Sequence, residues 1–333
     1  MRFGIIGCGS IAASSFAPAL VASHKLELAA VCRRDLSKAQ QFAERFGGCA
    51  HYGSAEALLA DDSVEAVVVA TGTDTHRDFT VAAARAGKHV LCEKPMGRDR
   101  HECREMIEAC GEHGVKLAVA YRRRLFPQVV AAKRLLADGR IGRTVCTRTH
   151  YSGGGGWGGP DVWQLQPVIG GALMEMAVHR IEVLLNLADS EPTEVSGTLD
   201  TVAQDWQVDD SDAILLRFAD GTIGVHSTIM TSKPRRDFAQ VDGTEGRLVI
   251  DGLEFGGESI ELETEAGREQ IAVTPLQPGV FDLPMLEDLA AAAREDREPV
   301  CDGVMGYRVQ AVCDATRESS ESGRRVTVEA FGG

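Results

Sequence analysis

Short apolar runs alternate with helical hydrophobic patterns through the first third of the chain. The segment "VEAVVVAT" at 64–71 is almost continuously apolar, which is typical of a strand buried on both faces. The segment "KAQQFAERFG" at 38–47 has a helical pattern closed by glycine. Repeated strand–helix units of this kind predict a doubly wound parallel sheet, which binds ligands at the carboxyl ends of its strands.

From residue 122 the pattern changes to consecutive strands joined by short turns. The turns include D-G in "FADGTIG" at 218–224 and G-T-E-G at 243–246. Such a series predicts a large open, mainly antiparallel sheet. A helix predicted at 170–187 is expected to cover one side of it.

The predicted fold class is therefore α/β, in two domains. Residues 1–121 are expected to form an N-terminal Rossmann dinucleotide-binding domain, and residues 122–333 a C-terminal α+β domain. The last helical patterns, at 283–295 and 304–319, are expected to pack back on the first domain.

The composition is that of an ordinary globular protein, since 44% of the 333 residues are hydrophobic and 25% are charged. The formal net charge of -14 argues against a nucleic-acid or membrane partner, because phosphate groups require a basic surface. The nine cysteines form no C-x-x-C pair, which favours reduced thiols in a cytoplasmic protein. We expect neither a signal peptide nor a membrane-spanning segment.

The first predicted strand runs into the motif Gly7-x-Gly9-x-x-Ala12. Gly7 permits a tight turn, Gly9 lets the backbone approach a pyrophosphate, and the small Ala12 lets the next helix pack on the strand. The start of that helix would face the phosphates with its partial positive charge. An ordinary strand-to-helix turn is the alternative, but the place of the motif between a strand and a helix favours dinucleotide binding.

Arg33 and Arg34 follow the second predicted strand, where a dinucleotide-binding fold contacts the adenosine ribose. An acidic residue there would bind the 2′-hydroxyl of NAD, whereas two guanidinium groups suit the 2′-phosphate of NADP. NADP is therefore the predicted cofactor. NAD stays possible, because the arginines can also be solvated loop residues or stack on the adenine.

The segment "GGALMEMAVHRIEVLL" at 170–185 predicts a helix that follows a glycine pair and carries Glu175 and His179 on one face. The two side chains could be a catalytic pair or two metal ligands. The spacing suggests no third ligand and the chain has no H-E-x-x-H motif, so no metal site is predicted.

Together these features resemble the Gfo/Idh/MocA oxidoreductases. The resemblance lies in the glycine turn at 7–12, in "AGKHVLCEKPMG" at 86–97 and in the glycine-led helix that carries His179. The segment "RRLFPQVVAAKRLLADGRIGRTV" at 123–145 resembles the linking helix and first C-terminal strand of that family. The resemblance covers most of the chain, and it implies NAD(P)-dependent hydride transfer on a sugar, a sugar derivative or a cyclitol.

The resemblance also implies roles for single residues. Lys94 matches the lysine that orients the substrate hydroxyl and the nicotinamide. Pro95 matches an often cis proline that aims this lysine, and Glu93 would orient the backbone or Lys94 itself. His179 matches the active-site histidine, and Glu175 stands where the family usually carries aspartate.

Two departures from the family pattern affect these sites. The extra methylene of Glu175 moves its carboxylate outward by about 1.5 Å relative to aspartate. Glu175 therefore either contacts the substrate or only orients the imidazole. Thr71-Gly72-Thr73 replaces the T-P-N of the family, in a loop that normally lines the nicotinamide.

The chemistry of alcohol oxidation suits these side chains. A base takes the hydroxyl proton and a cation stabilises the developing alkoxide while hydride passes to the nicotinamide. An imidazole titrates near neutral pH, so His179 is the predicted general acid/base, and Lys94 polarises the oxygen. Glu175 completes the predicted catalytic set.

The predicted cofactor contacts lie in the glycine turn and at the ends of predicted strands. They are Gly7, Gly9, Ser10, Ile11, Ala12, Arg33, Arg34, Thr71, Thr73, His76, Glu93 and Lys94. Among them, His76 begins a helix and is expected to cap or pack rather than to catalyse.

A glycine-rich segment at 151–171, "YSGGGGWGGPDVWQLQPVIGG", is interpreted as a lid or pocket wall, with a mobile loop as the alternative. The flat faces of Trp157 and Trp163 suit the apolar side of a pyranose or cyclitol, and Gln166 could bond a hydroxyl. The predicted substrate contacts are Lys94, Tyr121, Arg123, Trp157, Trp163, Gln166, Glu175 and His179.

Two charged clusters leave alternatives open. The segment "YRRRLF" at 121–126 ends the last Rossmann strand, and its arginines either face the substrate or form a solvated edge. Asp209, Asp210 and Asp212 precede a predicted strand and are interpreted as a solvated turn, although they could receive an amino sugar.

Two other functions are compatible with the resemblance. Some relatives hydrolyse glycosides through transient oxidation by a tightly held NAD, and others are non-catalytic NAD(P)-binding regulators. The presence of both Lys94 and His179 favours the oxidoreductase. By analogy with the family, the C-terminal domain is expected to serve substrate binding and oligomerisation, with the open face of its sheet forming a homodimer or a homotetramer.

Overall fold

The computed structural model describes residues 1–154, 163–254 and 256–332. The chain divides into two compact units. The first comprises Met1–Arg122 and Gln277–Tyr307, and the second comprises Arg123–Leu276 and Arg308–Gly333.

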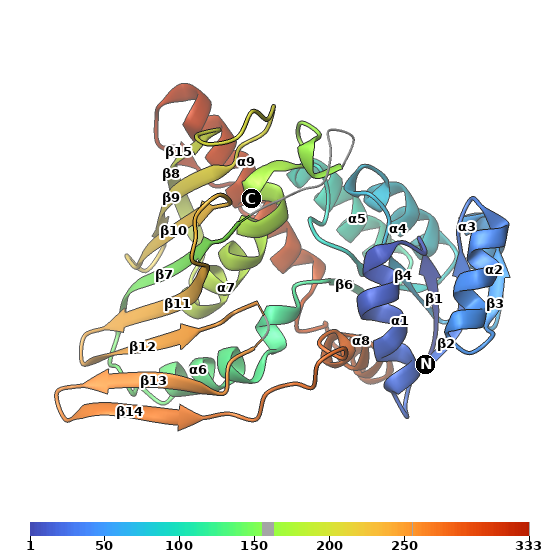
Figure 1. Ribbon diagram of the computed structural model, residues 1–333, viewed down its shortest axis with the longest axis horizontal. Helices are drawn as coiled ribbons and strands as arrows, with labels where there is room; N and C mark the ends of the chain where they lie inside the picture. The colour runs from blue at the N-terminus through green and yellow to red at the C-terminus, as the bar shows by residue number, and fades with distance from the viewer. Residues whose placement is uncertain (155–162, 255, 333) are drawn as a thin grey trace. The chain divides into compact units, whose positions relative to one another are not determined.

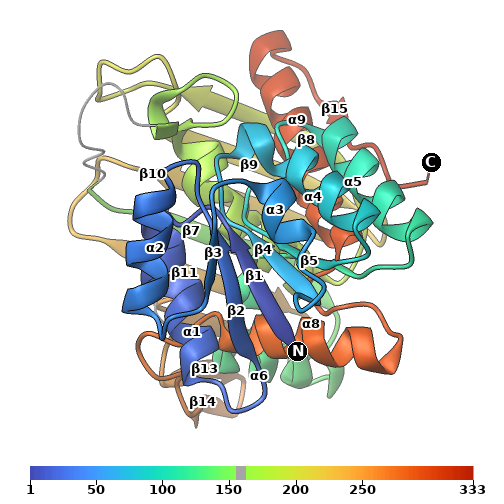
Figure 2. The same ribbon diagram turned by 90° about the vertical axis from the view of Figure 1, so that its right-hand side faces the viewer.

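The first unit is built on a six-stranded parallel sheet of order β3-β2-β1-β4-β5-β6 (Figure 2). Its strands are β1 (Arg2–Ile6), β2 (Glu27–Cys32), β3 (Ala50–Tyr52), β4 (Ala66–Val69), β5 (His89–Cys92) and β6 (Leu117–Val119). Every residue of β4 is buried, as expected for a strand covered on both faces. The predicted doubly wound parallel sheet is confirmed.

Helices cover both faces of this sheet. The order of the strands reverses between β1 and β4, so right-handed crossovers on the two sides of that point place their helices on opposite faces. On one face α1 packs on α8, and on the other α3, α4 and α5 pack on one another (Figure 2). The helical segments are η1 (Ala12–Phe16), α1 (Ala17–Ala22), α2 (Leu36–Arg45), α3 (Ala55–Leu59), η2 (Thr73–Thr75), α4 (His76–Arg85), α5 (Arg100–Glu112) and α8 (Leu283–Glu295).

The second unit is built on a nine-stranded sheet of order β14-β13-β12-β11-β7-β10-β9-β8-β15 (Figure 1). Its strands are β7 (Thr144–Ser152), β8 (Pro192–Asp200), β9 (Ser211–Phe218), β10 (Ile223–Ile229), β11 (Arg236–Gly243), β12 (Gly246–Asp251), β13 (Ser259–Thr264), β14 (Gly267–Ala272) and β15 (Val326–Thr327). Strands β7 and β10 pair in parallel, and the other pairs are antiparallel. The predicted open, mainly antiparallel sheet is confirmed.

One face of the nine-stranded sheet is covered by helices. The helix α7 (Val178–Ala188) follows the π-helical segment η5 (Leu173–Ala177) and packs on β7, β10 and β11, while α6 (Pro127–Ala137) packs on β12 and β13. The remaining helical segments are η3 (Arg122–Leu125), η4 (Trp163–Leu165) and α9 (Gly303–Ser322), which contributes its first residues to the first unit and the rest to the second. Burial alternates along β9, so Ile214, Leu216 and Phe218 face the helices.

The G-T-E-G turn between β11 and β12 requires glycine for a steric reason. A Cβ on Gly243 would lie 2.1 Å from the carbonyl oxygen of Ile141. That same carbonyl accepts a hydrogen bond from the Glu245 amide at 2.9 Å. The turn is therefore held against the segment that follows α6.

All nine cysteines are free thiols in the structure. Burial raises the pKa of Cys8 to about 12 and that of Cys32 to about 11, so these thiols are unreactive at neutral pH. Within the described residues, no helix is both long enough and apolar enough to cross a membrane.

Candidate functional site

The carboxyl ends of β1, β2, β4 and β5 lie along one edge of the parallel sheet. The glycine turn follows β1 at the point where the strand order reverses, and this is where open α/β sheets bind ligands. Arg33 follows β2, Thr71 follows β4 and Lys94 follows β5. The fold therefore brings most of the predicted cofactor residues to one edge of the first unit.

The glycine turn has the geometry that a dinucleotide site requires. Gly7 has a φ of 101°, and a Cβ there would lie 2.6 Å from the Ala70 carbonyl oxygen. A Cβ on Gly9 would meet no atom within 4 Å, so the backbone is open to a ligand at that point. Ala12 is fully buried, as packing of helix on strand demands.

The helix after the turn begins with a π-helical segment, Ala12–Phe16, where the sequence predicts an ordinary helix. The amide of Ala17 donates to the carbonyl of Ala12, five residues earlier. Ser10 and Ile11, two predicted cofactor contacts, are exposed just before this segment.

Arg33 and Arg34 are both exposed. The Nη1 of Arg33 donates a 2.9 Å hydrogen bond to the Cys8 carbonyl inside the glycine turn. The next residue, Asp35, caps α2 by accepting from the Lys38 amide. The Asp35 carboxylate is thus engaged by the helix, while Arg33 and Arg34 are exposed after β2 and the guanidinium of Arg33 lies beside the glycine turn.

His76 packs between the ends of β4 and β5. It is buried, with Nδ1 2.9 Å from the Pro95 carbonyl oxygen and Nε2 3.2 Å from that of Thr71. Burial lowers the pKa of His76, and a neutral ring donates a hydrogen bond to only one of these two carbonyls. The ring packs where the sequence expects a packing role. Thr73 is buried too, and Thr71 accepts a 2.8 Å hydrogen bond from the Thr75 hydroxyl.

Glu93 and Lys94 lie directly after β5, and both are partly buried. The Lys94 amide donates to Glu93 Oε2 at 2.9 Å, so Glu93 holds the backbone at Lys94, as the resemblance implies. The Lys94–Pro95 peptide bond is cis, also as expected. The pKa of Glu93 is raised to about 7, mainly by burial, with the nearby charge of Asp282 acting in the same direction and those of Lys94 and Arg122 acting against it.

The arginines after β6 do not form a solvated edge, which corrects one of the alternatives for this segment. In the first unit Arg122 donates to Asp282, and Ser15 also donates to that carboxylate. In the second unit Arg123 pairs with Glu254 at 2.6 Å, and Arg124 pairs with Glu182 at 2.6 Å.

Tyr121 and Arg123 are each only 1% exposed. Both were expected to contact substrate, and that contact stays a prediction. Arg123 is buried against Glu254, so its guanidinium also stabilises the second unit through this ion pair.

In the second unit, the helix that carries Glu175 and His179 begins after two glycines that admit no side chain. A Cβ on Gly170 would lie 2.2 Å from the Gln164 carbonyl oxygen, and one on Gly171 2.2 Å from Asp209 Oδ1. Glu175 lies in the π-helical segment and His179 just after it, and both side chains are partly buried.

Arg180, the residue after His179, anchors this helix to the sheet. Its side chain has no exposed surface and makes two hydrogen bonds to Asp237, of 3.1 and 2.8 Å, and one of 2.7 Å to Glu254. The guanidinium also lies 4.5 Å from the Tyr151 ring centroid. Burial opposes the charge, but Asp237 and Glu254 raise the pKa of Arg180. These partners were not found from the sequence, because they come from distant segments.

The acidic cluster before β9 is not a solvated turn, which corrects that interpretation. Asp210 has no exposed surface and accepts from the amides of Val202, Ala203 and Gln204. Asp212 is buried 3.4 Å from Nε2 of His226. Burial raises the pKa of Asp212 well above its usual range and lowers that of His226 to about 3, so His226 is neutral near pH 7. The alternation of the strand could have predicted this burial, because Asp212 and the apolar Ile214 are two residues apart and lie on the same, buried face of β9.

Three of the predicted substrate contacts lie in or near the glycine-rich segment. Trp157 lies outside the described residues. Trp163 begins the short turn η4, and Gln166 is exposed, with its carbonyl accepting from the Gly170 amide at 2.9 Å. Their contacts with substrate stay predictions.

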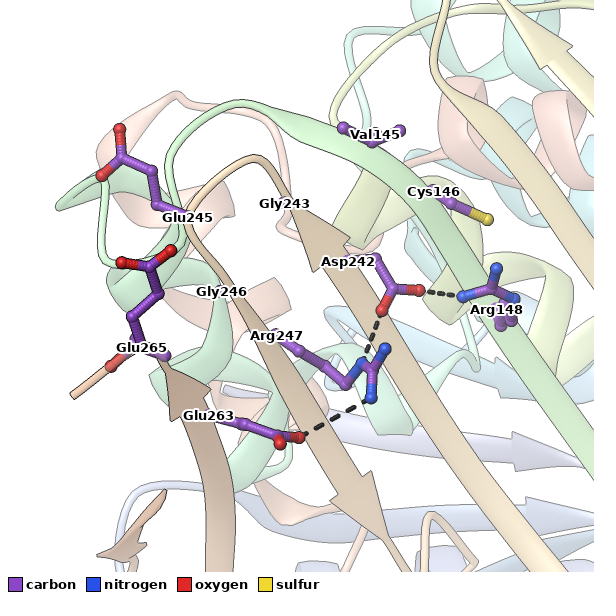
Figure 3. A pocket seen from close by; sticks show the side chains of 11 residues that line it. Val145, Cys146, Arg148, Asp242, Gly243, Glu245, Gly246, Arg247, Glu263 and Glu265 are labelled. Atoms are coloured by element: carbon purple, nitrogen blue, oxygen red, sulfur yellow. Dashed lines mark hydrogen bonds and ion pairs between the residues drawn. The ribbon is translucent and has the colours of Figure 1, made fainter. Parts of the chain in front are cut away.

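A depression of about 640 Å³ lies on the nine-stranded sheet, lined from β7, β11, β12 and β13 (Figure 3). Asp242 lies between two arginines there, accepting from Arg148 and, at 2.6 Å, from Nε of Arg247. Arg247 also pairs with Glu263 at 3.6 Å. These charges compensate one another across neighbouring strands, and such cross-strand pairs stabilise the pairing of the strands. Within the described residues, no group of three or more His, Cys, Asp or Glu side chains could hold a metal ion.

The first unit therefore belongs to the nucleotide-binding Rossmann class. The chain is a member of the Gfo/Idh/MocA oxidoreductases: the profile described as "Oxidoreductase family, NAD-binding Rossmann fold" matches residues 1–121, and the profile of the family's C-terminal domain matches residues 129–249. The resemblance seen in the sequence is confirmed. The chain is thus an oxidoreductase with a nicotinamide dinucleotide as its cofactor.

Three relatives show how far the likeness extends. A Haloferax volcanii protein named "D-xylose 1-dehydrogenase (NADP(+)) 2" is 30% identical over 99% of this chain and 100% of its own. The 1,5-anhydro-D-fructose reductase of Ensifer adhaerens is 28% identical over 98% of both chains. The crystal structure of the aldose-aldose oxidoreductase from Caulobacter crescentus, complexed with glycerol, has a TM-score of 0.89 at 26% identity, over 98% of this chain and 99% of the other.

Because the pKa of Glu93 is raised in the folded protein, the free energy of unfolding should depend on pH through this residue. Glu93→Gln is expected to raise the free energy of unfolding at pH 8 by up to about 3 kcal/mol. The folded chain keeps the Glu93 proton to about pH 7, whereas the unfolded chain releases it from about 4.5. The wild type therefore loses stability as pH rises through this window, and the uncharged variant escapes that loss.

Urea unfolding from pH 4 to pH 8 measures this difference, which should vanish below about pH 4.5. Glu112→Gln, at an exposed position of α5, is the control and should show no such trend. A constant difference between Glu93→Gln and wild type across the range would contradict the assignment.

Proposed function

We propose that this chain is an NADP-dependent oxidoreductase that transfers hydride between the nicotinamide and a secondary hydroxyl or ketone of a sugar, sugar derivative or cyclitol. The observation that carries the proposal is the set of groups at the carboxyl ends of the parallel strands, where the open glycine turn follows β1, exposed Arg33 follows β2 and partly buried Lys94 follows β5. The substrate class is supported by the names of the relatives, which act on xylose, anhydrofructose and aldoses.

The proposed mechanism divides the work between Lys94 and His179. A bound nicotinamide supplies the hydride acceptor. Lys94 places its ammonium at the substrate oxygen, which lowers the energy of the developing alkoxide. His179 takes the hydroxyl proton in oxidation and returns it in reduction, because an imidazole titrates in the required range. Glu175 orients the imidazole or contacts the substrate directly.

The backbone on both sides of the Lys94 side chain is held by neighbouring residues. The Lys94 amide is held by Glu93, and the following carbonyl, that of Pro95, faces the buried ring of His76. A side chain that has to meet a developing charge must be placed before the reaction, since reorganisation during it would raise the barrier.

The first test is turnover on a panel of aldoses, polyols, cyclitols and the matching ketones, followed by the absorbance of the reduced nicotinamide. Lys94→Ala should lower kcat by about a hundredfold or more while the Kd of NADP changes little. The double variant Lys94→Ala/His179→Ala should lower kcat by a smaller factor than the product of the factors measured for the two single variants. The effects are not multiplicative because the two residues serve one step.

Lys116→Ala, which removes a partly buried lysine paired with Asp296 and Glu298, is the matched control and should keep wild-type turnover. Equal kcat in Lys94→Ala and wild type would remove Lys94 from the mechanism. Cofactor binding without turnover of any panel member would favour a regulator, and cleavage of a glycoside without net cofactor turnover would favour a hydrolase.

NADP is proposed over NAD because two exposed guanidinium groups follow β2 and the neighbouring acid, Asp35, caps α2. Arg33→Ala should weaken NADP binding by about ten- to hundredfold, as expected for loss of a charge-assisted contact, and NAD binding much less. Titration of cofactor fluorescence measures both constants. Arg45→Ala, at an exposed position near the end of α2, is the control, and an unchanged NADP preference in Arg33→Ala would overturn the assignment.

A homodimer or homotetramer through the open face of the nine-stranded sheet is also proposed. Leu215, Ile223 and Ile229 are 46%, 42% and 36% exposed and share that face. Apolar side chains gathered on one exposed face favour association.

Light scattering should therefore give the mass of two or four chains for the wild type, and Ile223→Glu should shift it toward one chain. Val202→Glu, at a 72% exposed position outside the strands, should leave the mass unchanged. A wild type with the mass of a single chain would contradict the proposal. A cytoplasmic location is likewise proposed, on the ground that all nine cysteines are free.

A further inference from the structure

The helix that carries Glu175 and His179 is capped by a residue from a distant segment. The Ala172 amide donates to the Asp209 carbonyl at 2.8 Å, and the Leu173 amide donates to Asp209 Oδ2 at 2.7 Å across 36 positions of sequence. Amides in the first turn of a helix have no partner within the helix, and a side chain at its start usually supplies one. Here the residues at the start are Gly170 and Gly171, which have no side chain to offer.

The fit between this cap and the glycines is steric as well as polar. Gly171 has a φ of 88°, and a Cβ there would lie 2.2 Å from Asp209 Oδ1. The carboxylate thus occupies the space that any other side chain at 171 would need. The carboxylate of Asp209 can reach the helix amides because Gly171 has no side chain in its way.

We propose that Asp209 is a positioning residue, whose carboxylate fixes the first turn of this helix and thereby the placement of Glu175 and His179. Its effect on turnover rests on the proposed function, in which those two side chains serve hydride transfer. Asp209 itself is not proposed to touch substrate or cofactor.

The π-helical segment explains why this first turn matters. Leu173, whose amide Asp209 holds, is also the residue whose carbonyl accepts the i+5 bond from the Val178 amide. Without the cap, the turn can fray or shift to the i+4 bonding of an ordinary helix. Either change would turn Glu175 relative to His179, which follows the segment directly.

Asp209 is itself held firmly enough to act as a support. Its neighbour Asp210 binds the amides of Val202, Ala203 and Gln204, and the Met230 amide donates to the Asp210 carbonyl at 2.9 Å. The bond from Met230 is made to the backbone of Asp210, so it still holds this segment when the Asp210 side chain is removed. That side chain makes none of the bonds to the helix amides, which makes Asp210 a matched control.

The experiment compares Asp209→Ala, Asp209→Asn and Asp210→Ala in the full-length protein. Hydrogen exchange of a peptide covering 171–180 reports the cap directly, and kcat with NADP and an active panel substrate reports positioning. Asp209→Ala should lose protection in this peptide and lower kcat by about a hundredfold, the scale expected for misplacement by about 1 Å, with NADP affinity unchanged. Asp209→Asn should restore both, because an amide oxygen caps a helix as well as a carboxylate does.

Asp210→Ala should keep the protection of 171–180 and kcat near wild type, even where it lowers the melting temperature. Should Asp209→Ala keep wild-type protection or wild-type kcat, Asp209 would have no positioning role. A failure of Asp209→Asn to rescue would also overturn the cap as the cause. Absence of turnover in the wild type would overturn the proposed function together with any role of Asp209 in it, whereas turnover in the wild type with equal kcat in Asp209→Ala would overturn the role of Asp209 alone.

Discussion

A buried guanidinium needs carboxylates beside it to balance its charge, and the second unit contains such a group in Arg180, whose side chain has no exposed surface. Asp237 on β11 and Glu254 beyond β12 supply these carboxylates, and Glu254 is shared with the buried Arg123. Burial would raise the pKa of Glu254, but the two arginines hold it far below its usual range. One ionic cluster thus joins α7, the nine-stranded sheet and Arg123 at the start of the second unit. Loss of any member would leave another buried charge unbalanced.

The first unit places its chemical groups by a different principle. The carboxyl ends of parallel strands lie along one edge of the sheet, so residues far apart in sequence come together there. Gly7, Arg33 and Lys94 follow three different strands of one sheet. Their alignment depends on strand register, and buried strands such as β4 fix that register because both of their faces are covered.

Sequence periodicity therefore predicted the first unit more fully than the second. The alternation of strands and helices determined the sheet, and the strand ends then located the predicted residues on one edge. In the second unit the sheet was also predicted, but not the partners of its buried charges. Asp209, Asp210 and Asp212 share a short segment and differ completely in role, since one binds helix amides, one binds loop amides and one is buried beside His226. Composition alone makes such a run look solvated, because charged residues are usually exposed.

Both glycine-led helices begin with a feature that no hydrophobic pattern reports. The segments Ala12–Phe16 and Leu173–Ala177 are π-helical, and each stands just after the glycines of its motif. A π turn holds one extra residue, so it is less regular than the α-helix that follows and depends on outside contacts to persist. Ser15 in the first segment donates to Asp282, and Leu173 in the second donates to Asp209. In both units a carboxylate from a distant segment thus holds the irregular turn, and in both the turn adjoins the residues proposed to act.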